Sequence, residues 1–357
     1  MFALGFLISQ QIMFYFYRTE GKPERDVETL TIFMIVATII GARLGHVFFY
    51  EAKRFLANPI DIIKVWEGGL ASHGAAIAIP LALFLYTRYF INIGWGKFEV
   101  KKRKRPNQSF LWVVDRIVIV VALTGALIRI GNFMNSEIVG KPTGDESGVV
   151  FAHWLERSLE NYSYGNYISN ADATTHESKG PDGITYPVAV DIEFERHVSP
   201  DEAKALLEKE IIPSLSTLPN YEYVRNFFRV DEDQNFTYSV SAKKGITHAF
   251  FVADGIPLYP TQLYEAGSYL IIFFILFLLW AKMKEKTPEG MLFGLFLILV
   301  FGMRFIWEFL KANQEAFEDD LAINMGQILS IPAVLIGVGL FIYSLSNRNK
   351  KTQKATV

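Results

Sequence analysis

Polar side chains occur inside long apolar stretches of this sequence, where a hydrocarbon surrounding is expected. The members of this set are Arg43, His46, His73, Arg129, Asn132, Arg304 and Glu308. A charge at the centre of a bilayer costs roughly 2.5–3.5 kcal/mol on insertion scales, so each charged residue needs a partner or an aqueous cavity. These positions are therefore the first candidates for chemistry.

The depths of these residues agree with one another. Arg43 and Arg304 each lie about 14 residues past the inner end of an apolar stretch, which places both about 21 Å up a helix. Arg129 is near the outer end of its stretch, and His73 is near the outer start of another. Guanidinium groups bind phosphate through two parallel hydrogen bonds, and an imidazole accepts a proton near neutral pH. The pattern predicts a phosphate site with a proton acceptor in the outer half of a membrane.

Simpler interpretations stay open for Arg43 and Arg304. Arg43, His46 and Tyr50 share one helix face, so Arg43 could only tie helices together. Arg304 and Glu308 are four residues apart and could neutralise each other as a structural ion pair. That pairing would still leave guanidinium donors of Arg304 free.

The histidine and the glycines also have a structural interpretation. A lone His73 would usually be a hydrogen-bonded core residue, but its place between Ser72 and Gly74 favours an exposed ring with closely packed backbone around it. Two pairs of small residues are interpreted as helix packing only, namely Gly41/Gly45 and Gly290/Gly294.

The composition is that of a membrane protein. Of 357 residues, 51% are apolar and only 20% are charged, too few for the surface of a soluble protein of this length. The absence of cysteine excludes disulfides, thiolate metal sites and a cysteine nucleophile. The sequence predicts an all-α polytopic membrane protein with about seven transmembrane helices, near 1–17, 29–50, 68–90, 111–130, 266–282, 290–310 and 322–345.

Basic residues predict the orientation of these helices. They gather in alternate connections, at Arg18, Lys22 and Arg25, at Lys97 and Lys101–Arg105, at Lys282, Lys284 and Lys286, and at Arg348, Lys350, Lys351 and Lys354. All four groups lie on one side if the chain crosses seven times, so that side is cytoplasmic and the N-terminus is outside.

A soluble segment separates the fourth and fifth apolar stretches. Residues 188–194 alternate between apolar and polar side chains, and residues 221–230, 236–242 and 246–252 also favour strands. Ser199 to Glu202 form a capping box that opens a helix to about Leu215. We expect three parts: helices one to four in 1–140, a small extracytoplasmic α+β insertion in 141–257, and helices five to seven with a cytoplasmic tail in 258–357.

Five motifs resemble those of the prolipoprotein diacylglyceryl transferase family. They are Gly41-Ala42-Arg43-Leu44-Gly45, Trp66-Glu67-Gly68-Gly69-Leu70-Ala71-Ser72-His73-Gly74, Arg129-Ile130-Gly131-Asn132-Phe133-Met134-Asn135-Ser136-Glu137 with Gly140, Tyr259-Pro260-Thr261-Gln262-Leu263-Tyr264-Glu265, and Arg304-Phe305-Ile306-Trp307-Glu308-Phe309. The motifs occur in the family's order and cover both membrane blocks. The segment around Arg129 is the most specific of them.

The resemblance implies an activity, two substrates and a set of site residues. Members of the family move the sn-1,2-diacylglyceryl group of phosphatidylglycerol to the lipobox cysteine of a prolipoprotein, on the outer leaflet of the bacterial inner membrane. His73, Arg129 and Arg304 then match catalytic positions. Substrate-binding positions match Arg43, Arg129, Asn132, Glu137, Gly140, Gln262, Tyr264, Glu265, Arg304 and Glu308. The resemblance implies no cofactor and no metal, and no nucleic-acid partner.

The chain differs from the family in three places. The family has a functional tyrosine upstream of the point that corresponds to Met1. Ala75 stands where the family often has a second glycine after its histidine, and the soluble segment is longer than usual. The residue pattern alone would also fit a transporter or an anion channel, although no internal repeat relates the two halves. A scaffold is disfavoured by the cost of the buried arginines.

Overall fold

The computed structural model describes residues 1–69, 71–94, 97–102, 105–163, 166–213, 227–229, 238–312 and 323–355. The chain forms two compact units. The helical unit comprises Phe2–Gly125, Tyr269–Val300 and Ala333–Val357, and the sheet unit comprises Met1, Ala126–Ser268 and Phe301–Pro332. The division between them falls within four helices.

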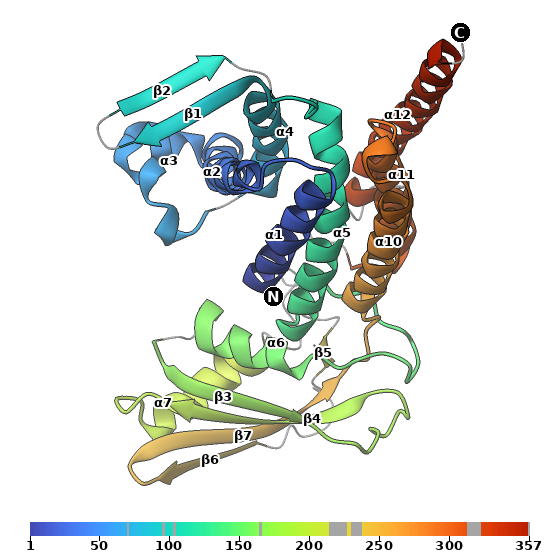
Figure 1. Ribbon diagram of the computed structural model, residues 1–357. Helices are drawn as coiled ribbons and strands as arrows, with labels where there is room; N and C mark the ends of the chain where they lie inside the picture. The colour runs from blue at the N-terminus through green and yellow to red at the C-terminus, as the bar shows by residue number, and fades with distance from the viewer. Residues whose placement is uncertain are drawn as a thin grey trace. The chain divides into compact units, whose positions relative to one another are not determined.

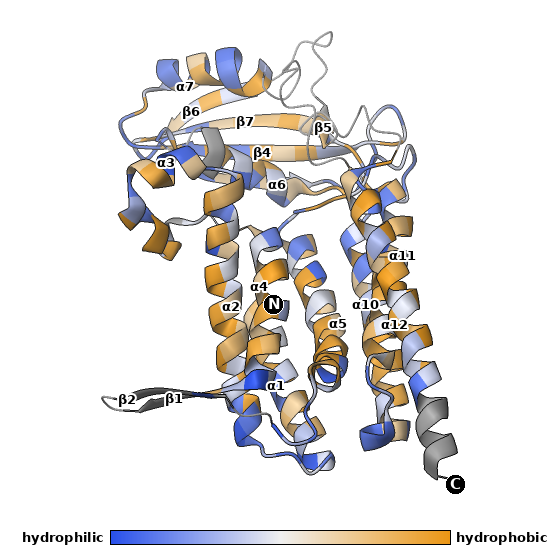
Figure 2. Cartoon of the chain, turned by 90° about the horizontal axis from the view of Figure 1, so that it is seen from above, coloured by the Kyte–Doolittle hydropathy of each residue, from blue (hydrophilic) through white to orange (hydrophobic). Residues whose placement is uncertain are grey.

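Each of the seven apolar stretches forms a helix. These are α1 (Phe2–Thr19), α2 (Arg25–Phe49), α4 (Ser72–Arg88), α5 (Phe110–Met134), α10 (Thr261–Met283), α11 (Met291–Trp307) and α12 (Met325–Ala355), and Figure 2 shows apolar residues along them. Among the described residues, five helices are long and apolar enough to cross a membrane, and α1 and α4 are not among these five. The 17 residues of α4 rise only about 26 Å, and α1 carries Gln10, Gln11 and Arg18.

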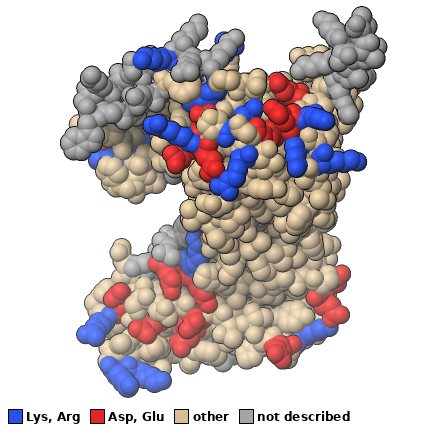
Figure 3. Space-filling model, viewed as in Figure 1, with Lys and Arg blue, Asp and Glu red and all other residues tan. Residues whose placement is uncertain are grey.

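The surface of the protein suits an apolar surrounding. On the face seen in Figure 3, a broad stretch of the surface carries no Lys, Arg, Asp or Glu side chain. Large apolar side chains are exposed on the helices, for example Ile271 at 63% on α10 and Leu335 at 67% on α12. Lipid contacts remove the cost that such side chains would have in water.

Glycines let two helices of the helical unit approach closely. A Cβ on Gly74 of α4 would lie 1.9 Å from the Gly41 carbonyl oxygen and 2.7 Å from the Gly45 Cα. No larger residue fits at this crossing of α2 and α4, as expected for small residues between membrane helices. The predicted packing role of Gly41 and Gly45 is therefore confirmed.

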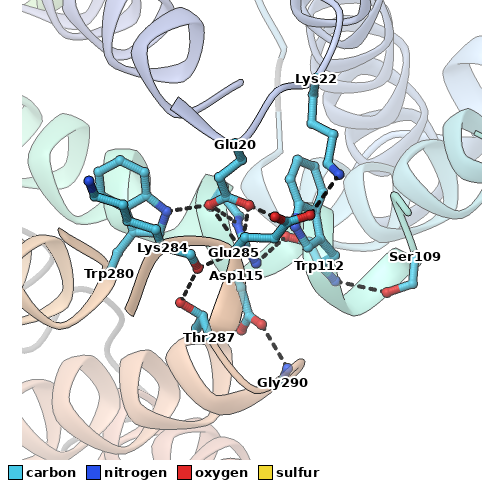
Figure 4. Close-up of polar contacts among 11 residues, drawn as sticks. Glu20, Lys22, Ser109, Trp112, Asp115, Trp280, Lys284, Glu285, Thr287 and Gly290 are labelled. Carbon is cyan, nitrogen blue, oxygen red and sulfur yellow. Dashed lines mark hydrogen bonds and ion pairs between the residues drawn. The ribbon is translucent and has the colours of Figure 1, made fainter. Parts of the chain in front are cut away.

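A buried carboxylate joins three parts of the helical unit. Glu20, just after α1, receives hydrogen bonds from the Trp112 and Trp280 indoles at 3.0 and 2.6 Å (Figure 4). Arg116 of α5 completes the set through Nε and Nη2, and neither charged side chain is exposed. The neighbouring Asp115 accepts from the Gly290 and Phe293 backbone N–H groups at the start of α11. A buried charge is tolerated when its hydrogen bonds are filled in this way.

Shorter elements connect the helices of this unit. A short helix α3 (Ala52–Ala57) and two 3-10 turns (Pro59–Ile63 and Val65–Glu67) lead from α2 to α4. Strands β1 (Tyr89–Gly94) and β2 (Lys97–Lys102) then pair antiparallel, with Tyr89 opposite Lys102. The sequence predicted only a basic loop here, and Arg103 and Lys104 of that loop lie outside the described residues.

The sheet unit contains a five-stranded antiparallel sheet (Figure 1). Its order is β3 (Ile168–Thr175), β4 (Tyr186–Phe194), β7 (Ile246–Gly255) and β5 (Phe228–Arg229), with β6 (Tyr238–Lys243) also paired to β7. Two short helices, α6 (Ala152–Arg157) and α7 (Pro200–Leu206), precede π-helical turns at Ser158–Ser163 and Leu207–Ile211. The inward side chains of β4 are almost fully buried, at Val188, Val190, Ile192 and Phe194.

Most of the predicted soluble elements are present. The alternation at 188–194 lies in β4, residues 246–252 lie in β7, and the Ser199–Glu202 capping box is formed with both of its hydrogen bonds. Residues 221–226, 230, 236 and 237 of the other two predicted strands lie outside the described residues, as does the predicted helix end near Leu215. The sequence missed β3, α6 and the two π turns.

Candidate functional site

The segment from Arg129 to Gly140, which we call the signature segment, begins in α5 and ends in a tight loop. Ser136 and Ile138 both have positive φ, of 54° and 57°. This conformation is strained for residues with a Cβ, most of all for a β-branched one, and such strain gathers at functional sites. Glu137 lies between them, and its carboxylate accepts from Asn132 Nδ2 at 3.2 Å and from Arg157 Nη1 at 3.3 Å.

Gly140 closes the signature segment between two other parts of the chain. Its N–H donates to the Tyr259 carbonyl at 3.0 Å, and the next residue, Lys141, donates to the Leu310 carbonyl at 2.8 Å. A Cβ on Gly140 would lie 2.5 Å from the Tyr259 oxygen and 2.8 Å from the Leu310 oxygen. Glycine is thus the residue that lets these three backbone segments meet.

A group of buried charges lies at the end of α11 and the start of α10. Arg129 Nε is 2.5 Å from Glu265 Oε2, and Lys311 Nζ is 3.5 Å from Glu265 Oε1 and 3.6 Å from Glu308 Oε2. Glu265 and Lys311 are 1% and 3% exposed. Burial lowers the pKa of the Lys311 ammonium, and the two carboxylates oppose this effect. Gly326 of α12 leaves room for Glu308, because a Cβ there would lie 2.4 Å from its carboxyl carbon.

The charges of Arg129 and Arg304 also lower the pKa of the Lys311 ammonium, and Arg304 Nε is buried without a hydrogen-bond partner among the described residues. We call the five residues Arg129, Glu265, Arg304, Glu308 and Lys311 the charge cluster. The alternative interpretation of Arg304 and Glu308 as an ion pair is not what the structure contains, since Glu308 pairs with Lys311 instead. The reason is that α11 ends at Trp307 and Glu308 begins a 3-10 turn, so the i,i+4 geometry of an α-helix is interrupted.

Buried polar atoms without a hydrogen-bond partner concentrate around this cluster. Among the described residues they are Arg105 Nη2, Asn132 Oδ1, Gln262 Oε1, Glu265 Oε2, Arg304 Nε and Glu308 Oε2. Five of these six belong to the signature segment, the charge cluster or Gln262. The two carboxylate oxygens face cations, since Glu265 Oε2 is 2.5 Å from Arg129 Nε and Glu308 Oε2 is 3.6 Å from Lys311 Nζ. Asn132 Oδ1, Gln262 Oε1 and Arg304 Nε therefore remain without a partner among the described residues. Leaving one such group unpaired costs about 1–3 kcal/mol, so a polar ligand that satisfied several of them would bind favourably.

The motif at the start of α10 supports the signature segment. Gln262 Nε2 donates to the Glu137 carbonyl at 2.8 Å, and Thr261 Oγ1 donates to the Ile138 carbonyl at 3.4 Å. The Tyr264 ring packs against Trp307 of α11, with ring centroids 5.3 Å apart. Glu265 is the member of this motif that reaches the charge cluster.

His73 and Arg43 belong to the helical unit. His73 is the second residue of α4 and its side chain is exposed, with the Tyr50 and Phe49 rings 6.3 and 6.4 Å away. Arg43 is only 4% exposed, and all three of its nitrogens donate to backbone carbonyls of the loop before α4. The acceptors are Asp61, Ile62, Gly68 and Gly69.

Sequence reasoning missed two charged residues of this region, Lys311 and Arg157. Lys311 follows Glu308 by three residues at the end of an apolar stretch, which is a usable signal. Arg157 lies in the soluble segment, and no sequence pattern there predicted its ion pair with Glu137. Among the residues that the structure describes, no three His, Cys, Asp or Glu side chains gather in a way that could hold a metal ion.

Comparison with known proteins gives one consistent result. The family model for prolipoprotein diacylglyceryl transferase matches residues 1–343. A phosphatidylglycerol–prolipoprotein diacylglyceryl transferase of Tolumonas auensis is 33% identical over 98% of this chain and 90% of its own length. Proteins of the same name from Chloroherpeton thalassium and Porphyromonas gingivalis are 32% and 29% identical, over 96% and 97% of this chain and 86% and 88% of their own lengths.

Proposed function

Because this chain belongs to the prolipoprotein diacylglyceryl transferase family, we propose that it transfers the diacylglyceryl group of phosphatidylglycerol to the lipobox cysteine of prolipoproteins. The cysteine sulfur forms a bond to the glycerol carbon of the lipid, and the bond from that carbon to the phosphate oxygen breaks. Glycerol phosphate leaves with the bonding electrons, and the thiol proton passes to a base. This reaction is the first step of lipoprotein maturation.

The observation that carries the proposal is the set of unpaired buried polar atoms beside two arginines. Asn132 Oδ1 and Gln262 Oε1 can accept hydrogen bonds, and Arg304 Nε can donate one. A phospholipid headgroup with glycerol hydroxyls and a phosphate offers partners of both kinds. Arg129 and Arg304 are positioned in this proposal to offset the negative charge that grows on the departing phosphate.

His73 is the general base of this proposal. A cysteine thiol with a pKa near 8.5 is mostly protonated at neutral pH and is a weak nucleophile until it loses its proton. The exposed ring at the start of α4 is free to meet a substrate from outside the helical unit. Arg43 has a positioning role in this proposal, because it holds the loop that leads to His73.

The proposed reaction requires a particular placement in the membrane. We propose that α1 and α4 join the five longer helices to give seven spans, with the N-terminus outside and the C-terminus in the cytoplasm. The sheet then belongs to an extracytoplasmic domain of about residues 141–257, and the charge cluster faces the outer leaflet of the inner membrane. Both substrates are held by the membrane, so we propose that they enter laterally between helices. Reporter fusions after Lys354 and near Asn220 should report opposite sides.

A transfer assay with purified protein tests the function. Protein in detergent micelles with phosphatidylglycerol should add a diacylglyceryl group to a lipobox peptide, seen by mass spectrometry, and should leave a peptide with serine in place of cysteine unmodified. His73→Gln should abolish most of this transfer, while His46→Gln should retain it, because His46 stacks on Tyr50 and faces no reacting group in the proposal. No transfer by correctly folded wild-type protein would refute the proposed function.

A further inference from the structure

The charge cluster does not balance to zero. Three cations, Arg129, Arg304 and Lys311, lie with two carboxylates, Glu265 and Glu308, so the formal sum over these described residues is one positive charge. Glu137 lies outside this sum, because it is half exposed and pairs with Arg157. In a site of low dielectric constant, one uncompensated charge strongly favours a ligand of opposite sign.

Lys311 is the residue that makes the sum positive, and the fold fixes it in place. The backbone at 310–312 pairs with the signature segment through the Lys141 N–H to the Leu310 carbonyl and the Ala312 N–H to the Val139 carbonyl, at 2.8 and 3.2 Å. The Lys311 side chain is only 3% exposed, so its ammonium lies inside the protein and not in solvent. Its contacts with both carboxylates, at 3.5 and 3.6 Å, also leave Arg129 and Arg304 less neutralised than they would be without it.

We propose that Lys311 is a specificity-determining residue, whose ammonium gives the charge cluster its preference for a lipid headgroup of net negative charge over a zwitterionic one. This inference rests on the proposed function, since it assigns the choice of donor lipid to the same site. Lys311 acts through the field of the cluster and needs no contact with the substrate. A purely structural lysine would neutralise Glu265 and Glu308 with no effect on the choice of lipid.

The test compares variants that change the net charge of the cluster in both directions. Lys311→Met brings the formal sum to zero, Lys311→Arg keeps it at one, and Glu308→Gln raises it to two. The double variant Lys311→Met with Glu308→Gln restores a sum of one without any ammonium. Each variant is checked for folding by size-exclusion chromatography and thermal unfolding before use.

Two measurements are made on each folded variant. The first is binding of glycerol phosphate to the detergent-solubilised protein by calorimetry, with uncharged glycerol as the control. The second is transfer from phosphatidylglycerol in micelles that contain a rising fraction of phosphatidylethanolamine, which competes as a headgroup without net charge. The ratio of the two lipids' apparent affinities is the readout that a structural role would not change.

The proposal predicts an order of affinities for glycerol phosphate. Lys311→Met should bind about ten- to a hundredfold more weakly than wild type, as expected for the loss of one nearby charge in a partly buried site. Lys311→Arg should stay near wild type, the double variant should bind more tightly than Lys311→Met, and Glu308→Gln should bind more tightly than wild type. Of the four variants, Lys311→Met alone should show a weaker preference for phosphatidylglycerol over phosphatidylethanolamine.

The outcomes separate this inference from the proposed function. Absence of transfer by wild-type protein would refute the function, whereas normal transfer with unchanged lipid discrimination in Lys311→Met would refute the role of Lys311. Failure of the double variant to recover anion binding while it remains folded would also overturn the inference. If Lys311→Met does not fold, Glu308→Gln decides alone, because unchanged or weaker anion binding there contradicts the charge argument.

Discussion

The Nε of Arg43 donates to the Ile62 carbonyl at 2.9 Å, so a buried guanidinium of α2 holds the loop that leads to His73. Its Nη1 reaches the Gly68 and Gly69 carbonyls, and its Nη2 reaches that of Asp61. A flat fork with donors on three nitrogens can serve four acceptors at once. The sequence left two interpretations of this arginine open, and these contacts favour a tie between helix and loop over a phosphate contact.

Replacement of Arg43 by lysine is expected to loosen this loop. The ammonium keeps the charge but cannot span the four carbonyls, so buried acceptors lose their partners. We expect the transfer rate to fall by about tenfold or more, at about 1–3 kcal/mol per acceptor left unpaired. The matched control is Arg54→Lys on the neighbouring α3, where the arginine is 59% exposed and its ion pair is with Glu51. Equal rates in Arg43→Lys and wild type would contradict the role of the tie.

Gly140→Ala tests the meeting of three backbone segments. The new methyl would lie 2.5 Å from the Tyr259 carbonyl oxygen, which requires the backbone to shift. Overpacking of this kind costs about 1–3 kcal/mol, and here it would displace the segment that carries Glu137. We expect a lower unfolding temperature and a large loss of transfer.

The control for Gly140 is Gly302→Ala in α11. A Cβ on Gly302 meets nothing within 4 Å, and alanine is the better helix former. This variant should be as stable as wild type or more so. Similar behaviour of the two variants would show that the close contacts of Gly140 do not matter.

The sequence could predict a strand or helix where the pattern of apolar and polar residues within that segment was clear. The alternation at 188–194 predicted β4 because one face of that strand is apolar and the other is more polar. Strand β3, at Ile168–Thr175, buries only Ile168 and two alanines and carries polar residues elsewhere. No local rule distinguishes such a strand from a loop.

The same limit applies to the site. The sequence predicted a depth for Arg129 and Arg304 from their distances to the ends of apolar stretches, and that depth stays a prediction. The pairing of Arg129 with Glu265, and of Glu265 with Lys311, was not visible, since these residues come from different segments and meet only in the tertiary structure. The i,i+4 rule also assumed that α11 continues past Trp307, which it does not.

The buried pair of Glu20 and Arg116 should be essential for the stability of the helical unit. Arg116→Met leaves the Glu20 carboxylate buried with only the Trp112 and Trp280 indoles as partners among the described residues, and breaking a buried pair costs about 3–5 kcal/mol. The double variant Glu20→Gln with Arg116→Met removes the stranded charge and should recover part of this loss. Thermal unfolding in detergent, followed by size-exclusion chromatography, measures both. A double variant less stable than Arg116→Met would contradict the stranded-charge explanation.

The last prediction concerns the two arginines of the charge cluster. The Nε of Arg129 pairs with Glu265, and the Nε of Arg304 has no partner among the described residues. Both guanidinium groups therefore have N–H donors left for a phosphate. Lysine keeps the charge but loses the planar fork, and a lost bond to a charged group is worth about 1.5–3 kcal/mol. Arg129→Lys and Arg304→Lys should therefore each slow transfer about ten- to a hundredfold if the bonds form in the transition state. Initial rates at matched protein levels test this, with Arg196→Lys on the exposed surface of the sheet unit as the control. Near-wild-type rates in both cluster variants would exclude a phosphate clamp built from these two residues.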